Sequence, residues 1–125
     1  MSASYDVTGM VLTSVPAGEY DKRVEILTRE RGRISGFARG ARRPGSPVMA
    51  AASPFVFGTF KISEGRSAYQ VIGAKVDNYF EKLRADITAA CIGSYFMEIL
   101  QYVTRENNDE TALLMLAYQS LRALE

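Results

Sequence analysis

Residues 22–39 read KRVEILTRERGRISGFAR. Two short runs, Lys22–Arg29 and Arg33–Arg39, flank the breaker pair Arg31-Gly32. Short runs containing β-branched residues, separated by a glycine, predict two β-strands joined by a turn. Because successive side chains of a strand point to opposite faces, the odd-numbered positions of the second run are expected to share one face: Arg33, Ser35, Phe37 and Arg39.

Three further strands are expected around this pair. Val7–Val15 is rich in β-branched residues and ends at a Pro-Ala-Gly turn signal. Phe55–Ile62 and Ala68–Ile72 are joined by a tight turn at Glu64-Gly65-Arg66, and the phenylalanines of the first of these strands are expected in the core. Five short strands with turn signals about every ten residues favour a small closed or partly open β-barrel, such as an OB-fold.

After Gly73 the hydrophobic pattern changes to the helical period. A short helix is expected at 77–83, and Asp86 is a candidate N-cap for a helix that runs to about Thr104. Asn107-Asn108-Asp109 is expected to cap a final helix that continues to the last residue. The wide apolar face of the longer helix predicts that it is largely buried, with these residues inside: Ile87, Cys91, Ile92, Tyr95, Phe96, Ile99, Tyr102 and Val103.

The expected fold class is α+β by chain order. A five-stranded β-barrel of OB-fold type is assigned to residues 1–77, and a partial α-helical domain to 78–125. A single cysteine and no histidine exclude an internal disulfide and argue against a metal site. No secretory signal and no apolar run of about 20 residues is present. These features predict a cytoplasmic protein without cofactors.

The charge is distributed unevenly along the chain. Residues 1–80 contain 11 Lys and Arg against 7 Asp and Glu, whereas residues 81–125 contain 4 against 7. Six arginines and one acid, Glu30, lie between Arg29 and Arg43. Such asymmetry indicates polyanion binding by the basic half, but a solvated basic edge strand would explain it as well.

Binding of single-stranded nucleic acid requires cations along the phosphates and flat side chains on which bases stack. Arginine suits both tasks because its planar guanidinium grips phosphate oxygens in pairs and stacks on bases. Phe37 is the first candidate platform, with Tyr20 and Tyr69 as others. The loop at 42–54 is also long enough for a functional role. The candidate nucleic-acid-binding residues are Arg29, Arg31, Arg33, Phe37, Arg39, Arg42 and Arg43.

The sequence contains no pattern typical of catalysis. There is no histidine, no Walker A sequence and no GxGxxG motif. Glu19 and Asp21 could share one side of a strand end, but turn acids exposed to solvent explain them better. The sequence therefore predicts a protein that is not an enzyme, with neither catalytic residues nor a metal site.

Several segments together resemble the N-terminal part of the RecO family of bacterial recombination mediators. The stretch at 26–44, ILTRERGRISGFARGARRP, is the most specific of them. The other similar segments are Val11-Leu12, Gly18–Asp21, Ser53–Phe55, Phe80–Ile87 and Tyr95–Leu100. The resemblance spans nearly the whole chain.

This resemblance implies an OB-fold followed by a helical domain and a role in DNA repair without catalysis. It implies binding of single- and double-stranded DNA, strand annealing and loading of the recombinase. The implied partners are RecR and the acidic C-terminal tail of the single-stranded-DNA-binding protein, in the nucleoid. Family members are longer than this chain, so part of the helical domain, and with it part of the tail-binding pocket, is expected to be missing. The residues implied to contact DNA are Arg33, Arg39, Arg42 and Arg43.

Three alternatives fit the same residues. An RNA-binding OB module would prefer RNA because only RNA offers a 2′-hydroxyl. A metal-dependent phosphodiesterase on a β-barrel would cleave labelled strands when magnesium or manganese is added. A purely structural interaction domain, with incidental arginines, would do neither.

Overall fold

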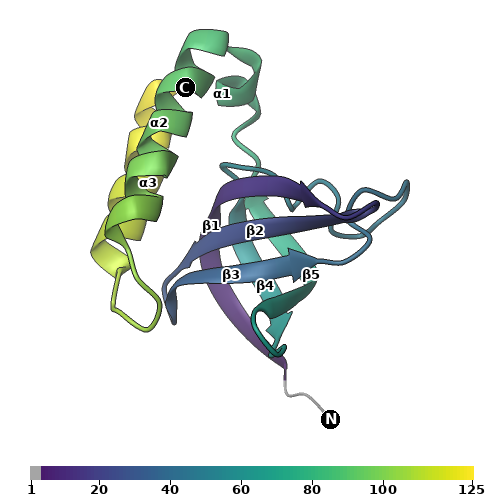
Figure 1. Cartoon of the computed structure of the whole chain (residues 1–125). Helices are drawn as coiled ribbons and strands as arrows, with labels where there is room; N and C mark the ends of the chain where they lie inside the picture. Colours follow the sequence, from purple (N-terminus) through teal and green to yellow (C-terminus); the bar gives the residue numbers. More distant parts are fainter. Residues whose placement is uncertain (1–3) are drawn as a thin grey trace.

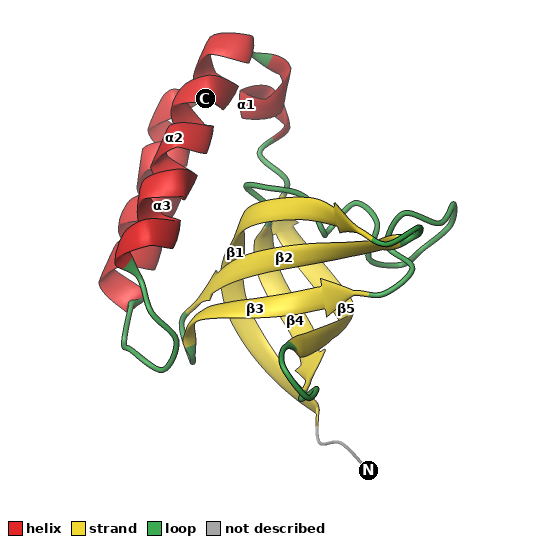
Figure 2. Ribbon diagram, in the orientation of Figure 1, coloured by secondary structure: helices red, strands yellow, loops and turns green. Residues whose placement is uncertain are grey.

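Five strands and then three helices follow one another in the computed structural model, which describes residues 4–125 (Figures 1 and 2). The predicted α+β order is confirmed. The strands are β1 (Ser4–Ala17), β2 (Asp21–Thr28), β3 (Gly32–Ala38), β4 (Phe57–Ser63) and β5 (Tyr69–Asn78). The helices are α1 (Glu81–Ala85), α2 (Ile87–Val103) and α3 (Thr111–Leu124).

The strands close into a barrel with the order β1-β2-β3-β5-β4, in which β4 pairs with β1. All pairs are antiparallel except β3 with β5, which run parallel where Gly36 faces Tyr69 and Phe37 faces Gln70. The five-stranded barrel predicted from the turn spacing, as either closed or partly open, is confirmed, and the structure shows that it is closed.

The core of the barrel is built by strict alternation of side chains. In β3, Gly32, Ile34, Gly36 and Ala38 are buried, whereas Arg33, Ser35 and Phe37 are only partly buried on the outer face. This confirms the predicted shared face for Arg33, Ser35 and Phe37, whereas Arg39 lies in the turn that follows β3. The residues at 39–56, between β3 and β4, also supply buried side chains to this core: Ala41, Val48, Ala51, Ala52 and Val56. The long loop therefore has a structural role, and its predicted functional role stays a prediction.

A second core joins the barrel to the helices. Met10, Leu12 and Leu27 lie on the outer face of β1 and β2 and are buried against the helices. Phe80, the N-cap residue of α1, and Phe55 also belong to this core. The helices contribute these apolar residues: Leu83, Ala89, Met97, Leu100, Leu114, Ala117 and Leu121. The antiparallel pair α2 and α3 thus packs beside the barrel, as Figure 1 shows. The predicted division into 1–77 and 78–125 stays a prediction, but the two parts share apolar packing.

The short helix predicted at 77–83 is displaced. β5 continues to Asn78, because Val76 and Asn78 pair with Gly58 and Phe57 of β4, and α1 begins only at Glu81. Ladder hydrogen bonds to β4 decide the conformation of these residues in place of the local hydrophobic period. The prediction was therefore wrong for Asp77 and Asn78, which belong to the barrel.

The predicted N-cap of α2 is confirmed, because the Asp86 side chain accepts a hydrogen bond from the Ala89 amide at 3.1 Å. The helix ends at Val103, and Thr104 is its C-cap.

The predicted burial of the wide apolar face of α2 was wrong. Ile87 is 82% exposed, Tyr102 is 89% exposed and Cys91 is also exposed. The buried face is instead Ala89, Gly93, Met97 and Leu100. A Cβ at Gly93 would lie 3.1 Å from Phe55 Cε1 and 3.3 Å from Leu121 Cδ2, so the close approach of these side chains favours glycine at this position. The bulky β-branched and aromatic residues are left on the opposite side of the helix.

The start of α3 agrees in part with the predicted cap. Asp109 Oδ1 accepts a hydrogen bond from the Thr111 amide at 3.1 Å, but Glu110 stands at the N-cap position without a side-chain cap bond. Leu114, Ala117 and Leu121 of α3 are buried. Within residues 4–125, no helix combines the length and the apolar content that crossing a membrane would require.

Candidate nucleic-acid interface

The arginines between Arg29 and Arg43 are divided between the two ends of β3. Arg29, Arg31 and Arg33 lie at the β2–β3 turn, whereas Arg39, Arg42 and Arg43 follow the other end of the strand. A strand of seven residues is about 23 Å long. One contiguous stretch of sequence therefore forms two separate cationic regions on the molecule.

The β2–β3 turn is occupied by contacts with the loop between α2 and α3. The amide of Arg33 donates to Arg105 O at 3.1 Å, and the amide of Asn107 donates to Arg31 O at 2.8 Å. Gly32, with φ of +68°, forms a bridge with Glu106, and a Cβ at this position would lie 2.3 Å from Arg105 O. The glycine is required here by its φ and by the close approach of the second backbone.

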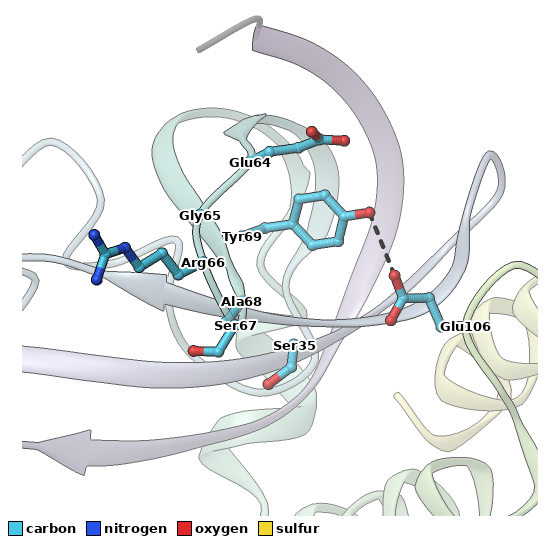
Figure 3. A pocket seen from close by; sticks show the side chains of 8 residues that line it. All are labelled: Ser35, Glu64, Gly65, Arg66, Ser67, Ala68, Tyr69 and Glu106. Atoms are coloured by element: carbon cyan, nitrogen blue, oxygen red, sulfur yellow. Dashed lines mark hydrogen bonds between the residues drawn. The ribbon is translucent and has the colours of Figure 1, made fainter. Parts of the chain in front are cut away.

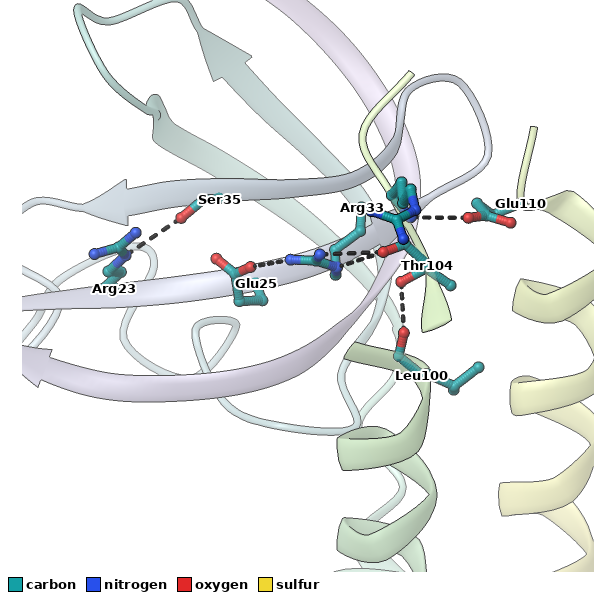
Figure 4. Close-up of polar contacts among 8 residues, drawn as sticks. Arg23, Glu25, Arg33, Ser35, Leu100, Thr104 and Glu110 are labelled. Atoms are coloured by element: carbon teal, nitrogen blue, oxygen red, sulfur yellow. Dashed lines mark hydrogen bonds and ion pairs between the residues drawn. The ribbon is translucent and has the colours of Figure 1, made fainter. Parts of the chain in front are cut away.

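Arg33 is engaged in the same contact (Figure 4). Its Nη1 forms a 2.7 Å ion pair with Glu25 Oε1, and Nε and Nη2 donate to Thr104 O at 3.2 and 3.1 Å. The side chains of Arg33 and Glu25 are only 26% and 13% exposed. All three nitrogens of this guanidinium have protein partners, which favours a structural role over the predicted DNA contact.

The two other arginines of this end are also in contact with neighbouring side chains. Arg31 lies over the Tyr5 ring at 4.3 Å and donates to Tyr69 Oη at 3.4 Å. Slight burial alone would lower its pKa, but the hydrogen bond and the charges of Tyr69, Tyr5 and Glu64 raise the pKa above its ordinary value. Arg29 is exposed and forms a 3.3 Å ion pair with Glu30.

The opposite end of β3 presents its cations to solvent. Arg39, Arg42 and Arg43 are exposed. The Arg43 guanidinium lies 4.1 Å from the centre of the Tyr20 ring, so a cation and a flat ring are already stacked at the β1–β2 turn. Arg42 Nη1 donates to Gly18 O at 3.3 Å.

Asp21 helps to hold together the two segments of this end, the β1–β2 turn and the residues that follow β3. Its Oδ1 accepts a hydrogen bond from the Gly40 amide at 2.7 Å, and the Arg42 amide donates to Tyr20 O at 2.8 Å. These bonds hold the β1–β2 turn against the residues that follow β3. Asp21 therefore positions the backbone of the basic end, and the pairing with Glu19 considered from sequence is not needed to explain it.

Arg23 belongs to this surface and was missed from the sequence. It pairs with Phe37 across β2 and β3, its guanidinium lies 6.0 Å from the Phe37 ring centre, and Nε donates to Ser35 Oγ at 3.3 Å (Figure 4). The signal that could have revealed it is the hairpin register, which places Arg23 opposite Phe37. We use the name distal basic surface for Tyr20, Arg23, Phe37, Arg39, Arg42 and Arg43.

Tyr69, the third aromatic candidate, lies on β5 beside Gly36 of β3 and is engaged in other contacts, so we do not count it among the residues of this surface. Its ring is partly buried, and its hydroxyl donates to Glu106 Oε2 at 3.3 Å in a polar hollow (Figure 3). The distal basic surface thus keeps Phe37 and Tyr20 as the aromatic side chains beside its arginines. Among residues 4–125, no three His, Cys, Asp or Glu side chains are grouped as a metal site would require.

Comparison with known proteins agrees with this architecture. The family model described as recombination protein O, N terminal, matches residues 1–80, which include the whole barrel. The chain belongs to the RecO family. The RecO family barrel is an OB-fold, and the strand order seen here matches that assignment.

Individual RecO relatives extend the similarity into the helices. The DNA repair protein RecO of Alkaliphilus metalliredigens is 32% identical over 117 residues, which cover 94% of this chain and 48% of that protein. The RecO protein of Exiguobacterium sibiricum is 33% identical over 117 residues, covering 94% and 47%. That of Acaryochloris marina is 30% identical over 125 residues, covering 100% and 43%. The chain thus spans about half the length of these curated relatives.

Proposed function

We propose that this chain takes part in DNA repair and recombination and binds single-stranded DNA at the distal basic surface. The observation that supports this most directly is that exposed Arg39, Arg42 and Arg43 follow the end of β3 that carries Phe37, with the Arg43 guanidinium stacked on the Tyr20 ring. The names of the relatives, DNA repair protein RecO, point to the same process.

The chemistry of this surface suits a single strand. Arg39, Arg42 and Arg43 offer guanidinium groups to successive phosphates, since a planar fork binds two phosphate oxygens at once. The Phe37 ring offers a base a flat apolar surface, and Arg23 lies within reach of the same ring. The same cations would contact the phosphates of a duplex without reading its sequence, so we include double-stranded DNA among the ligands.

Arg29, Arg31 and Arg33 have a secondary place in this proposal. The Arg29 guanidinium contacts Glu30. That of Arg31 contacts Tyr5 and Tyr69, and that of Arg33 contacts Glu25 and Thr104. A phosphate would have to compete with these partners. The Arg29 side chain is 60% exposed, whereas that of Arg33 is 26% exposed. Arg29 is therefore the best of the three to add a distant phosphate contact.

Wider activities are proposed from family membership. They are strand annealing, loading of the recombinase, and contacts with RecR and with the acidic tail of the single-stranded-DNA-binding protein, all without catalysis and within the nucleoid. The chain spans about half of its relatives' length, so each of these concerns the whole protein.

The direct test is binding of oligo-dT at several salt concentrations. Four phosphate contacts by Arg23, Arg39, Arg42 and Arg43 would give a slope of log K against log salt of about −3, at roughly −0.7 per contact. Replacing Arg39, Arg42 and Arg43 with alanine should reduce the slope to about −0.7. A slope unchanged by the triple substitution would remove the proposed surface from the binding site.

A matched control removes the same number of cations elsewhere. Lys82, Arg105 and Arg122 are exposed and lie outside the barrel, so their triple alanine variant has the same change in net charge. It should leave the slope unchanged. Oligo-rU of equal length separates DNA binding from the RNA-binding alternative, which predicts tighter binding of the RNA.

A further inference from the structure

A polar hollow of about 220 Å³ adjoins the distal basic surface (Figure 3). It lies between the outer face of β3, the β4–β5 turn and the loop between α2 and α3. Ser35 connects the two features, because it lines the hollow and its Oγ accepts the hydrogen bond from Arg23 of the distal basic surface. The side chains that determine its chemistry are Ser35, Glu64, Arg66, Ser67, Tyr69 and Glu106.

The two sides of this hollow differ in charge. Glu106 supplies a carboxylate from the α2–α3 loop, and its Oε2 accepts the Tyr69 hydroxyl, whereas no hydrogen bond within residues 4–125 uses its Oε1. Arg66, at the tip of the β4–β5 turn, is exposed, and Figure 3 shows its guanidinium directed away from Glu106. A fitting ligand would therefore present N–H donors at one end and negative charge at the other.

We propose that this hollow receives one nucleobase of the strand bound at the distal basic surface, and that it favours a base with an exocyclic amino group. The proposal rests on the proposed function. Ser35 and Phe37 are two residues apart on one face of β3, about 6.6 Å along the strand, so the platform and the hollow are neighbours. Two carboxylates, Glu64 and Glu106, make a free anion a poor occupant.

The preference follows from the donors and acceptors of each base. A carboxylate accepts hydrogen bonds from the amino group of cytosine, whereas thymine presents a carbonyl oxygen at the same place. The Glu106 carboxylate is acceptor-only when ionised, so it discriminates between these two bases of equal ring size. The Ser35 and Ser67 hydroxyls both donate and accept, so they tolerate either base. Arg66 would contact a phosphate of the same strand, and this contact would not depend on which base is bound.

The test compares oligo-dC with oligo-dT of equal length, using the complete chain at mildly alkaline pH and low salt. The wild-type chain should bind oligo-dC about fivefold more tightly, the lower end of the discrimination from one good base contact. Glu106→Gln should bring the two affinities close together, because an amide can also donate to thymine. Glu98→Gln, an exposed acid on α2, is the matched control and should keep the wild-type ratio. Arg66→Ala should weaken both oligonucleotides equally.

The outcomes separate the two proposals. Equal binding of both oligonucleotides by the wild-type chain, or a preference that survives Glu106→Gln, would overturn the base-recognition site and leave the proposed function in place. Binding of neither oligonucleotide would overturn both. Circular dichroism of each variant verifies folding, which the exposed positions of Glu106 and Arg66 should preserve.

Discussion

The guanidinium of Arg33 donates two hydrogen bonds to the carbonyl oxygen of Thr104, at 3.2 Å from Nε and 3.1 Å from Nη2. Thr104 is the C-cap of α2, so this contact joins the barrel directly to the end of the helix. Glu25 compensates the charge of the guanidinium from the neighbouring strand. An arginine that reads as a DNA ligand in the sequence is therefore part of the junction between the two cores.

Replacing Arg33 with alanine should lower the free energy of unfolding by about 2 kcal/mol, because Glu25 would keep a largely buried charge without a partner. Urea denaturation measures this. Arg39→Ala is the control on an exposed arginine and should change stability by less than about 0.5 kcal/mol. Equal effects of the two variants would contradict the structural role of Arg33.

Gly32→Ala should destabilise the protein by about 3 kcal/mol or more. The φ of +68° strains any L side chain, and the new Cβ would lie 2.3 Å from Arg105 O. Gly18→Ala separates the two causes, since Gly18 has a φ of +64° and a Cβ added there would meet nothing within 4 Å. Gly18→Ala should cost only about 1 kcal/mol. If thermal unfolding gave both variants the same loss, the close contact with the α2–α3 loop would not be significant.

Phe37→Ala should weaken binding of single-stranded DNA by about 1–3 kcal/mol, the range for one stacked base. The slope of log K against log salt should stay the same, since no phosphate contact is removed. Phe37→Tyr keeps the ring and should retain the affinity. Fluorescence anisotropy over a salt series measures both quantities, and an unchanged affinity for Phe37→Ala would show that the ring is not a stacking platform.

Asp109 should make the start of α3 sensitive to acid. Hydrogen bonds from the side chain and the amide of Thr111 lower the pKa of Asp109 below its ordinary value of 3.8. A depressed pKa means that the carboxylate stabilises the fold above pH 3.8 and that this contribution is lost as the pH falls through the folded-state pKa.

The variant Asp109→Asn tests this by removing the charge and keeping an acceptor. Its melting temperature should be below the wild-type value at neutral pH, and the difference should shrink on acidification through the range below pH 3.8. A difference that stays constant over this range would mean that the charge makes no contribution.

The barrel was predictable because its strands alternate inside and outside residues over short runs bounded by turn residues. In β3, each even position is buried and each odd position faces outward, as the period of two requires. The end of β5 was not predictable in this way. Lys75 to Asn78 are strand residues because β4 offers them backbone partners, and such pairing leaves no mark in a local pattern.

Helix α2 shows more clearly that the hydrophobic pattern of a sequence does not determine which face of a helix is buried. The sequence of α2 has bulky apolar residues over a wide arc, and the pattern alone assigns them to the core. The structure instead buries the face that carries Ala89, Gly93, Met97 and Leu100, and Phe55 and Leu121 approach this face closely at Gly93. Which side of an apolar helix is covered depends on the shape of its distant neighbours, and Phe55 lies far from α2 in the chain.

The arginines between Arg29 and Arg43 show which features depend on the sequence alone and which depend on the tertiary structure. The sequence by itself determined the order of strands before helices, the outward face of β3 and the concentration of cations in one segment, because each depends on local periodicity and composition. Only the tertiary structure decided that Arg33 joins the barrel to α2 while Arg39, Arg42 and Arg43 stay exposed. The physical reason is distance: a strand of seven residues separates the two groups by about 23 Å, and the loop between α2 and α3 packs against one end of the strand alone.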